Sequence, residues 1–308
     1  MNKLKYRKLV YYLLFISILT FLFVFSVDTT SSILTTVDLY INKVFPSLFL
    51  FVLFTSLVIK SSMLEYISKA FSFITKPFRL KKESSSAVLL GFLCGFPSAS
   101  SAIDKLYENR NISKKEAYHL MFFTNNASPI FIFSAVGNVM LGSKSIGLKL
   151  LFIHFISSII LGIIYPIISK DKIIIQENTD ILKINIKNSQ KKLDKFDILK
   201  LAIIDTFKTM LFILAYMIIF NILADILNSY NVPYLKYITA TFELTKGISS
   251  FSSIPNIPYI SFLLGFSSLS IIFQIKSSLK TLDYPIKRLI MSKLLHGLFS
   301  YLIALVIF

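Results

Sequence analysis

Residues 86–103 read SAVLLGFLCGFPSASSAI, an apolar stretch with a Gly-Phe-Pro turn at its middle. The stretch is short for a single spanning helix, which needs about 20 mostly apolar residues, and it is soft, meaning that glycine, proline and serine interrupt its apolar run. Lys81 and Lys82 precede it and Lys105 follows it, so both of its ends favour the cytoplasmic side. We therefore expect a re-entrant helical hairpin, whose turn has unpaired backbone groups that protein or a wet cavity must cover.

The composition of the whole chain indicates a membrane protein. Of its 308 residues, 55% are hydrophobic and 16% are charged, whereas soluble domains are about 45–50% apolar and about 25% charged. Nine glycines, nine prolines and one cysteine exclude the collagen-like, disordered and disulfide-scaffold classes. The lone Cys94 closes no internal disulfide, and no spacing of cysteine and histidine suits a zinc site. We expect a polytopic membrane protein without a metal or a cofactor.

The formal net charge of +17 agrees with that class. A nucleic-acid-binding protein carries such an excess as a patch on a polar domain. Here the lysines and arginines lie between apolar runs, as the cytoplasmic loops of membrane proteins require. We therefore expect the lipid bilayer, and no nucleic acid, as a partner, and the sequence is compatible with a homo-oligomer.

The first apolar run, residues 9–27, follows four basic residues. A signal peptide also begins this way, but this run is longer than a typical signal region and no small-residue cleavage site follows it. We expect an uncleaved transmembrane helix within residues 1–32, with its amino end in the cytoplasm. The chain is then a multi-pass protein of the cell membrane.

Residues 33–169 are predicted to form a first unit around the hairpin. After a span at 33–59, apolar side chains recur at helical spacing among lysines at 61–78, which is typical of a helix lying in the interface. Residues 117–141 are long enough to span, but Pro129 disfavours helix at Ser128 and donates no hydrogen bond to the helical ladder. We expect a broken helix there and a full span at 146–168.

The second unit, residues 198–308, repeats this order after a basic linker at 170–197 that we expect in the cytoplasm. A span at 199–227 precedes a soft segment at 234–253, a helix broken near Gly265 and a final span from Leu289. The lysine pattern puts the ends of the first hairpin in the cytoplasm and those of the second outside. The sequence predicts an all-α fold of two inverted repeats, each with a re-entrant hairpin and a broken helix, and a site where the breaks meet.

Four separated motifs resemble those of one family: GFLCGFP at 91–97, NNASPIF at 125–131, FELTKG at 242–247 and SKLLH at 292–296. Together they are similar to the YlbJ sporulation integral membrane proteins, which carry the nucleoside-recognition, or Gate, domain. The chain departs from that family after Pro97, where family members usually have small residues with a lysine. Residues 265–271 further resemble the broken helix of concentrative nucleoside transporters. The resemblance implies two Gate-like repeats, a role in spore formation and a nucleoside-like ligand.

The candidate binding residues are small or polar side chains at the two hairpin turns and the two breaks. They are Gly95, Pro97, Ser98, Asn125, Asn126 and Ser128 in the first half, and Glu243, Thr245, Gly247, Ser267, Ser268 and Gln274 in the second. A carboxylate at membrane depth is costly unless it meets a partner or water, so Glu243 is the leading candidate for binding a ligand or a coupling proton. Alternatives stay open, because Glu243 can pair with Lys246, the asparagines can cap the broken helix, and serines permit close helix packing.

Two histidines, His154 and His296, lie inside hydrophobic helices, where a proton relay and an interhelical hydrogen bond are the two interpretations. Nothing in the sequence resembles a P-loop, a metal motif or a Ser-His-Asp arrangement, so we expect no enzyme and no catalytic residues. We expect a transporter-like or permease-like protein for a small polar solute. The alternative is a structural or assembly membrane protein of spore formation that moves nothing.

Overall fold

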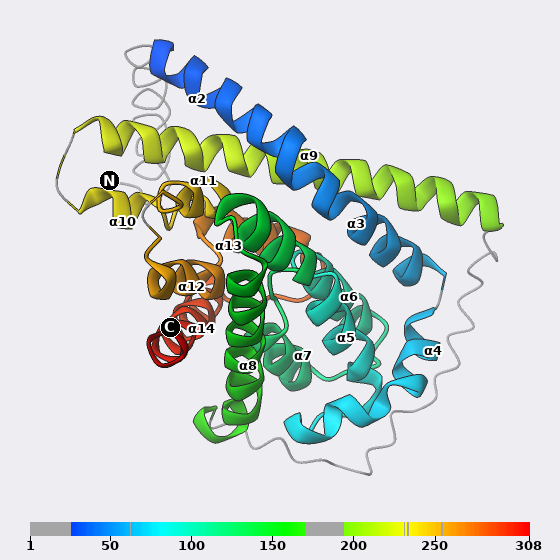
Figure 1. The fold of residues 1–308 in the computed structure, drawn as a ribbon. Coiled ribbons are helices and arrows are strands. Elements are labelled where there is room, and N and C mark those ends of the chain that lie inside the picture. Colours follow the sequence, from blue (N-terminus) through cyan, green and yellow to red (C-terminus); the bar gives the residue numbers. More distant parts are fainter. Residues whose placement is uncertain (1–25, 62, 170–193, 231, 233, 254) are drawn as a thin grey trace, which may run out of the picture.

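The computed structural model describes residues 26–61, 63–169, 194–230, 232, 234–253 and 255–308, and these residues fold into helices and turns without strands (Figure 1). Five of the described helices are long and apolar enough to cross a membrane: Thr29–Lys60, Lys144–Ile167, Lys195–Ser229, Ile257–Ser278 and Ile286–Ile307. The predicted all-α, multi-pass class is confirmed. The predicted span at 9–27 and the linker at 170–197 fall almost entirely outside the described residues.

Two long helices lie along each other across one side of the helical bundle (Figure 1). The first is continuous through α2 (Ser26–Leu39), η1 (Tyr40–Val44) and α3 (Phe45–Lys60), so the predicted boundary at residue 32 falls inside it. The second is α9 (Lys195–Ser229). A hydrophobic cluster joins them, built from Tyr40, Val44, Leu48, Val52, Met210, Ile213 and Met217.

The turn η1 is a π-helix, in which the chain is wound more widely than in an α-helix. The N–H of Phe45 donates to the carbonyl of Tyr40, five residues earlier. Pro46 follows directly and has no N–H to continue an α-helical ladder. The helix therefore continues past this proline, and α3 extends to Lys60.

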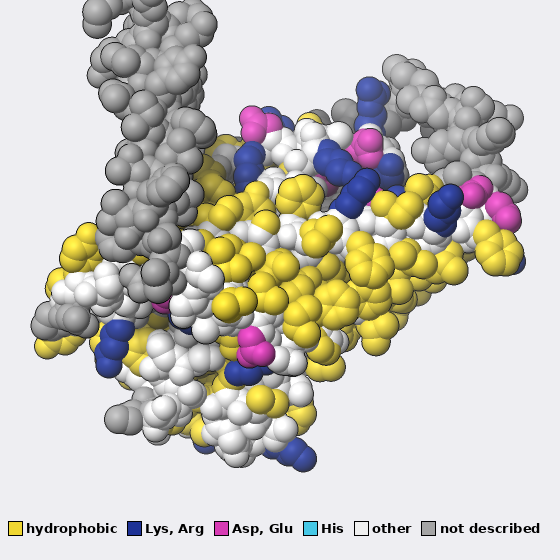
Figure 2. All heavy atoms as spheres, turned by 90° about the horizontal axis from the view of Figure 1, so that it is seen from above, with side chains coloured by type: hydrophobic (Ala, Val, Ile, Leu, Met, Phe, Trp, Pro, Cys, Tyr) yellow, Lys and Arg dark blue, Asp and Glu magenta, His cyan; other side chains and the backbone are white. Residues whose placement is uncertain are grey.

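Large apolar side chains cover the outer face of these two helices. In Figure 2 they form a band, and the charged side chains lie mostly toward its margins. Leu50 of α3 and Leu211 of α9 are 69% and 64% exposed. A soluble protein rarely exposes so continuous an apolar surface, whereas a lipid-facing surface requires one. The lipid bilayer is the environment that this face fits.

The predicted interface helix at 61–78 is divided into two pieces. They are α4 (Met63–Ala70) and η2 (Ser72–Phe78), a 3₁₀ segment that contains Pro77. A further short turn, η3 (Lys82–Ser84), leads into the bundle. The α-helix ends before Phe71, and Pro77 then disfavours a regular α-helix at the end of the second piece.

The hairpin stretch forms a pair of short helices, α5 (Ser85–Leu93) and α6 (Ser98–Glu108), which pack on each other. With 9 and 11 residues they are about 13 and 16 Å long, roughly half of a hydrocarbon core that is about 30 Å thick. Residues 94–97 make the turn between them, where Gly95 has φ +74°. These lengths suit a hairpin that enters a membrane and returns, and its depth in a membrane remains a prediction.

The first broken helix consists of α7 (Lys114–Phe123) and the π-helix η4 (Phe131–Met140). Residues 124–128 between them are not helical, which agrees with the disfavoured helix that Pro129 predicts at Ser128. The following helix, α8 (Lys144–Ile168), has no comparable break and corresponds to the predicted span at 146–168.

The second half also has a long helix, two short helices, a broken helix and a final long helix, but it has no counterpart of α4, η2 and η3. Its soft segment forms only α10 (Leu235–Thr239) and α11 (Leu244–Ser249), of five and six residues. Its broken helix is α12 (Ile257–Phe266) followed by α13 (Leu269–Ser278), and α14 (Ile286–Ile307) comes last. The break falls at Ser267 and Ser268, which both have positive φ, 71° and 80°. Inverted symmetry between the halves remains a prediction.

A single large core cluster contains side chains from both halves, including Leu120 of α7 and Leu263 of α12. One buried carboxylate also links them at the end of the bundle. Asp104 of α6 accepts hydrogen bonds from the backbone N–H groups of residues 280–282, at 2.7 to 3.3 Å. The first hairpin is thereby attached to the loop that leads into α14.

Candidate functional site

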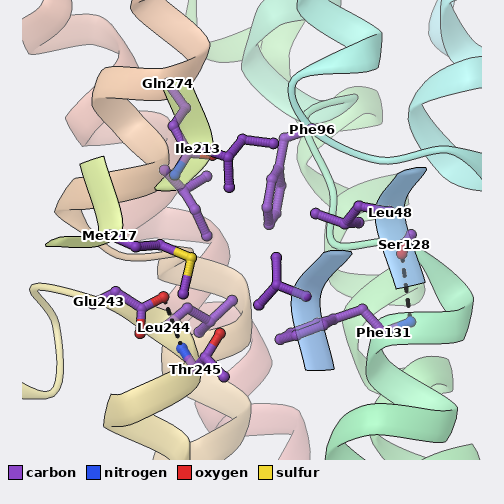
Figure 3. Close-up of a pocket in the computed structure, with 12 residues that line it drawn as sticks. Leu48, Phe96, Ser128, Phe131, Ile213, Met217, Glu243, Leu244, Thr245 and Gln274 are labelled. Atoms are coloured by element: carbon purple, nitrogen blue, oxygen red, sulfur yellow. Dashed lines mark hydrogen bonds between the residues drawn. The ribbon is translucent and has the colours of Figure 1, made fainter. Parts of the chain in front are cut away.

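A cavity of about 410 Å³, counting its open mouth, lies between the two long helices and the turns of the bundle (Figure 3). The long helices contribute Val44, Leu48, Ile213 and Met217 to its wall. The bundle contributes the apolar residues Phe96, Phe131, Leu244 and Ile271. Its wall is mostly apolar with a few placed polar groups, which is typical of small-molecule sites.

Four of the twelve predicted site residues supply the polar part of this wall: Ser128, Glu243, Thr245 and Gln274. They come from the first break, the second short helix pair and the second broken helix. The side-chain nitrogen of Gln274 donates to the hydroxyl of Ser270 at 3.0 Å, and this contact does not use the side-chain oxygen. The hydroxyl of Ser128 accepts from the N–H of Phe131 at 3.4 Å and so caps η4.

The carboxylate of Glu243 is 3% exposed and caps the first turn of α11. Its two oxygens accept from the backbone N–H groups of Thr245 at 3.1 Å and Lys246 at 2.8 Å. An ionised carboxylate has room for about four hydrogen bonds, so the two backbone donors do not use its full capacity. The cap explains how a carboxylate is held in a mainly apolar wall.

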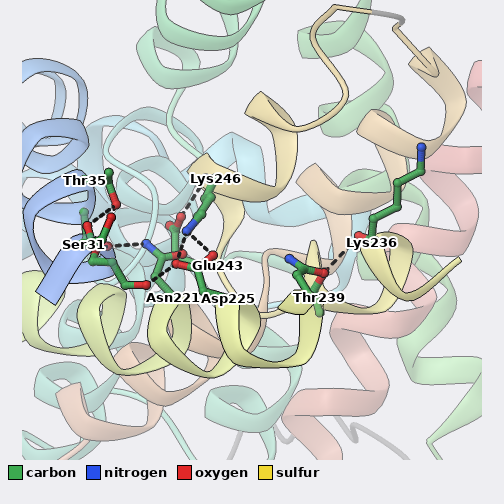
Figure 4. Close-up of polar contacts among 11 residues, drawn as sticks. Ser31, Thr35, Asn221, Asp225, Lys236, Thr239, Glu243 and Lys246 are labelled. Atoms are coloured by element: carbon green, nitrogen blue, oxygen red, sulfur yellow. Dashed lines mark hydrogen bonds and ion pairs between the residues drawn. The ribbon is translucent and has the colours of Figure 1, made fainter. Parts of the chain in front are cut away.

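The ammonium of Lys246 does not form the ion pair with Glu243 that the sequence left open. It pairs with the carboxylate of Asp225 on α9, which also accepts from the hydroxyl of Ser32 on α2 (Figure 4). One turn away, Asn221 donates to the hydroxyl of Thr36 at 2.9 Å. Polar contacts therefore join α2, α9 and α11 beside the cavity.

In the first half, the hairpin turn rests directly on the broken helix. The N–H of Phe96 donates to the carbonyl of Asn126 at 2.9 Å. Gly95 allows this approach, since a Cβ there would stand 2.8 Å from that carbonyl oxygen and from the backbone nitrogen of Ser128. The ring of Phe96 then faces the cavity across from Phe131 (Figure 3).

The second half makes a corresponding backbone contact. The N–H groups of Leu269 and Ser270 donate to the carbonyls of Thr241 and Phe242, at 2.8 and 3.0 Å. Gly247 packs just behind, because a Cβ on it would be 2.3 Å from the carbonyl oxygen of Ala240. In each half, the turn and the break of the same half lie together, and both pairs adjoin the cavity.

The remaining predicted residues stand behind the cavity wall. Asn125 donates to the carbonyl of Met121 at 3.1 Å, which is a capping contact at the end of α7. The side chain of Asn126 is fully buried, and neither of its amide atoms has a hydrogen-bond partner among the described residues. Ser268 caps α13 through the N–H of Ile271, at 3.5 Å, and Ser267 precedes it in the turn. Pro97 and Ser98 begin α6, where Ser98 is buried.

Three further buried polar side chains lie at the first break, and the sequence analysis did not include them among the binding residues. The ring of His154 on α8 accepts the N–H of Ala127 at 3.1 Å, and His296 on α14 contacts the carbonyl of His154 at 3.0 Å. Lys293, also on α14, donates to the carbonyl of Asn125. A lysine inside a hydrophobic helix was the sequence signal for this cluster. No group of three or more His, Cys, Asp or Glu side chains that suits a metal occurs in the described part of the chain.

Comparisons with known proteins agree with the motifs. Residues 41–144 match the Gate family model, described as nucleoside recognition, and this match contains the first hairpin and the first break. The chain is 23% identical over 302 residues to the sporulation integral membrane protein YlbJ of Bacillus subtilis (strain 168), with 86% of this chain and 74% of that protein covered. No solved structure matches the chain.

Proposed function

We propose that this chain is a permease-like membrane protein of spore formation that recognises a small polar solute, such as a nucleoside-like ligand. The observation that carries the proposal is the cavity, which is closed on one side by two long helices and on the other by the turns and breaks of both halves. Irregular backbone at membrane depth occurs where it lines a cavity, and in secondary transporters such breaks surround the solute. The match to the Gate model over residues 41–144 supports the same class of ligand.

The chemistry of the wall fits a ligand that has a flat apolar part and a few hydrogen-bonding groups. Phe96 and Phe131 provide aromatic surface, and Glu243 accepts hydrogen bonds from a hydroxyl or a ring N–H. Gln274 both donates and accepts, which suits the edge of a nucleobase. Two π-helical segments contribute Val44 and Phe131 to the wall, and π-helical turns are frequent at functional sites.

Uptake into liposomes tests the proposal. The purified full-length protein is reconstituted and screened against nucleosides, nucleobases and small spore solutes, with empty liposomes as the blank. We expect saturable movement of at least one nucleoside-like solute. A folded sample that moves and binds none of them favours the alternative, a structural membrane protein that moves nothing.

A matched pair of glutamate variants then locates the site. Glu243 and Glu116 are both 3% exposed and both cap a helix, but only Glu243 lines the cavity. We expect Glu243→Gln to weaken solute binding roughly 10- to 100-fold, because a hydrogen bond to a charged group contributes about 1.5–3 kcal/mol. Glu116→Gln should leave binding unchanged. Equal effects of the two variants would mean that Glu243 acts only as a helix cap.

The role in spore formation rests on the similarity to the Bacillus subtilis protein. The direct test is expression of this chain in a strain of that organism lacking the relative. We expect the wild-type chain and Glu116→Gln to restore heat-resistant spores and Glu243→Gln to restore far fewer. If Glu243→Gln restores spores as well as the wild type does, its carboxylate has no part in the role.

We further propose that the two halves are inverted repeats and that the amino end and the linker at 170–197 lie in the cytoplasm. Single cysteines at Lys105 and Asn256, in a variant without Cys94, test this arrangement with a membrane-impermeant thiol reagent. We expect labelling from outside at Asn256 and protection at Lys105. Labelling of Lys105 in intact cells would overturn the inverted arrangement.

A further inference from the structure

The break between α7 and η4 has backbone groups that bond outside their own helix. The carbonyl of Asn126 accepts from Phe96, and the N–H of Ala127 donates to His154. The carbonyl of Asn125 accepts from the ammonium of Lys293, which comes from α14 in the other half of the chain. A hairpin turn and two long helices therefore satisfy this stretch together, as a break at membrane depth requires.

Lys293 is an unusual partner for this position. Its side chain is 3% exposed and lies within the candidate span Ile286–Ile307. The ion pairs found among the described residues involve other lysines, so the acceptor that the structure gives to Lys293 is neutral. The titratable groups beside it are the rings of His154 and His296, with centroids 4.5 Å apart. A lone cation in a membrane helix is costly and marks a functional position by default.

The surroundings of the ammonium are those of a cation site. It lies just past the last residue of α7, where the partial negative charge of the helix dipole favours a positive charge. The side-chain oxygens of Asn125 and Asn126, in the same break, are buried without a hydrogen-bond partner among the residues the structure describes. Unwound carbonyls and the carboxyl ends of half-helices are the groups that hold coupling cations in secondary transporters.

We propose that the Lys293 ammonium is a built-in cation of this break, which takes the place of a free metal ion. Because the ammonium is covalently attached to α14, it stays when a solute leaves. The break therefore has a cationic donor of its own, and it needs no Na⁺ to hold the carbonyl of Asn125 in place. The consequence for solute movement, that it is independent of a Na⁺ gradient, rests on the proposed function.

Thermal unfolding of the purified full-length protein tests the ion site without any solute. The reaction of Cys94, the single cysteine, with a fluorogenic thiol reagent reports unfolding, because that thiol is 3% exposed in the fold. We expect the wild-type Tm to be the same in equal concentrations of NaCl, KCl and choline chloride. A Tm that is clearly higher in NaCl than in choline chloride would overturn the proposal.

Variants separate the charge from the hydrogen bond. Lys293→Arg keeps the charge, whereas Lys293→Gln keeps a donor without charge, and Lys149→Met removes a surface lysine of α8 as the matched control. We expect Lys293→Gln to lose several degrees of Tm, Lys293→Arg to lose clearly less, and the control to stay at the wild-type value. A Tm of Lys293→Gln equal to that of the wild type would overturn the proposal, and the wild-type salt comparison decides it if that variant does not fold.

The outcome is distinguishable from that of the proposed function. A null uptake screen leaves the unfolding results unaffected, since they require no solute. Uptake that is found and requires Na⁺ supports the proposed function and overturns the built-in cation.

Discussion

Replacing Gly95 by alanine tests whether the first hairpin turn rests on the broken helix. Gly95 has φ +74°, and Gly142 has φ +65° in the turn before α8, so alanine is strained by its backbone at both positions. The two differ in space: a Cβ at Gly142 meets nothing within 4 Å, whereas at Gly95 it meets backbone atoms of Asn126 and Ser128 at 2.8 Å. Gly142→Ala is therefore the control for the backbone effect alone.

The expected losses follow from these contacts. The left-handed conformation costs alanine about 1–2 kcal/mol, and this applies to both variants. Overpacking against backbone that shifts poorly adds about 1–3 kcal/mol for Gly95→Ala alone. At about 2 °C per kcal/mol for a chain of this size, the Tm of Gly95→Ala should fall roughly 2–6 °C below that of Gly142→Ala.

The assay is thermal unfolding in detergent with Cys94 reactivity as the signal, confirmed by loss of helical circular dichroism. Because Cys94 adjoins Gly95, its labelling rate in the folded protein at low temperature is also measured for both variants. Equal losses of Tm in Gly95→Ala and Gly142→Ala would refute the reasoning, since the turn would then not contact the break. A selective loss in Gly95→Ala supports the position of Phe96 in the cavity.

Three further predictions concern polar contacts between helices. Asp104→Ala should lower the free energy of unfolding by on the order of 3 kcal/mol, because several N–H groups of the loop before α14 lose their acceptor. Asp104→Asn should lower it less, and the same Tm for both variants would contradict this. Lys246→Met should lower the free energy of unfolding by only about 1 kcal/mol, since the side chains of its ion pair with Asp225 are 30% and 26% exposed. In a double-mutant cycle, Lys246→Met together with Asp225→Asn should cost less than the sum of the two single changes. His154→Phe should cost about 1–3 kcal/mol, because it leaves the N–H of Ala127 unpaired in the break. The observable is faster hydrogen exchange confined to residues 124–128, and unchanged exchange there would refute the contact.

The sequence by itself determined the class and the places where helices end. A chain that is 55% hydrophobic has too much apolar surface for a soluble fold, and the runs long enough to span are visible without coordinates. Pro129 has no N–H, so the break between α7 and η4 follows from covalent chemistry alone. The Gly-Phe-Pro turn of the first hairpin is equally local, since α5 and α6 end and begin within residues 93–98.

Only the tertiary structure decided which polar groups meet. The sequence offered Lys246 as the partner of Glu243 because the two are three residues apart, but the fold brings Asp225 of α9 closer to the ammonium. The sequence also gave no means of connecting Lys293 with Asn125, because these residues are 168 positions apart. The cavity wall likewise needed α3 and α9, whose inward residues are ordinary apolar side chains such as Leu48 and Ile213. Local rules set where the backbone bends, whereas a side chain's partner depends on how separate helices pack, and spacing along the chain does not encode that packing.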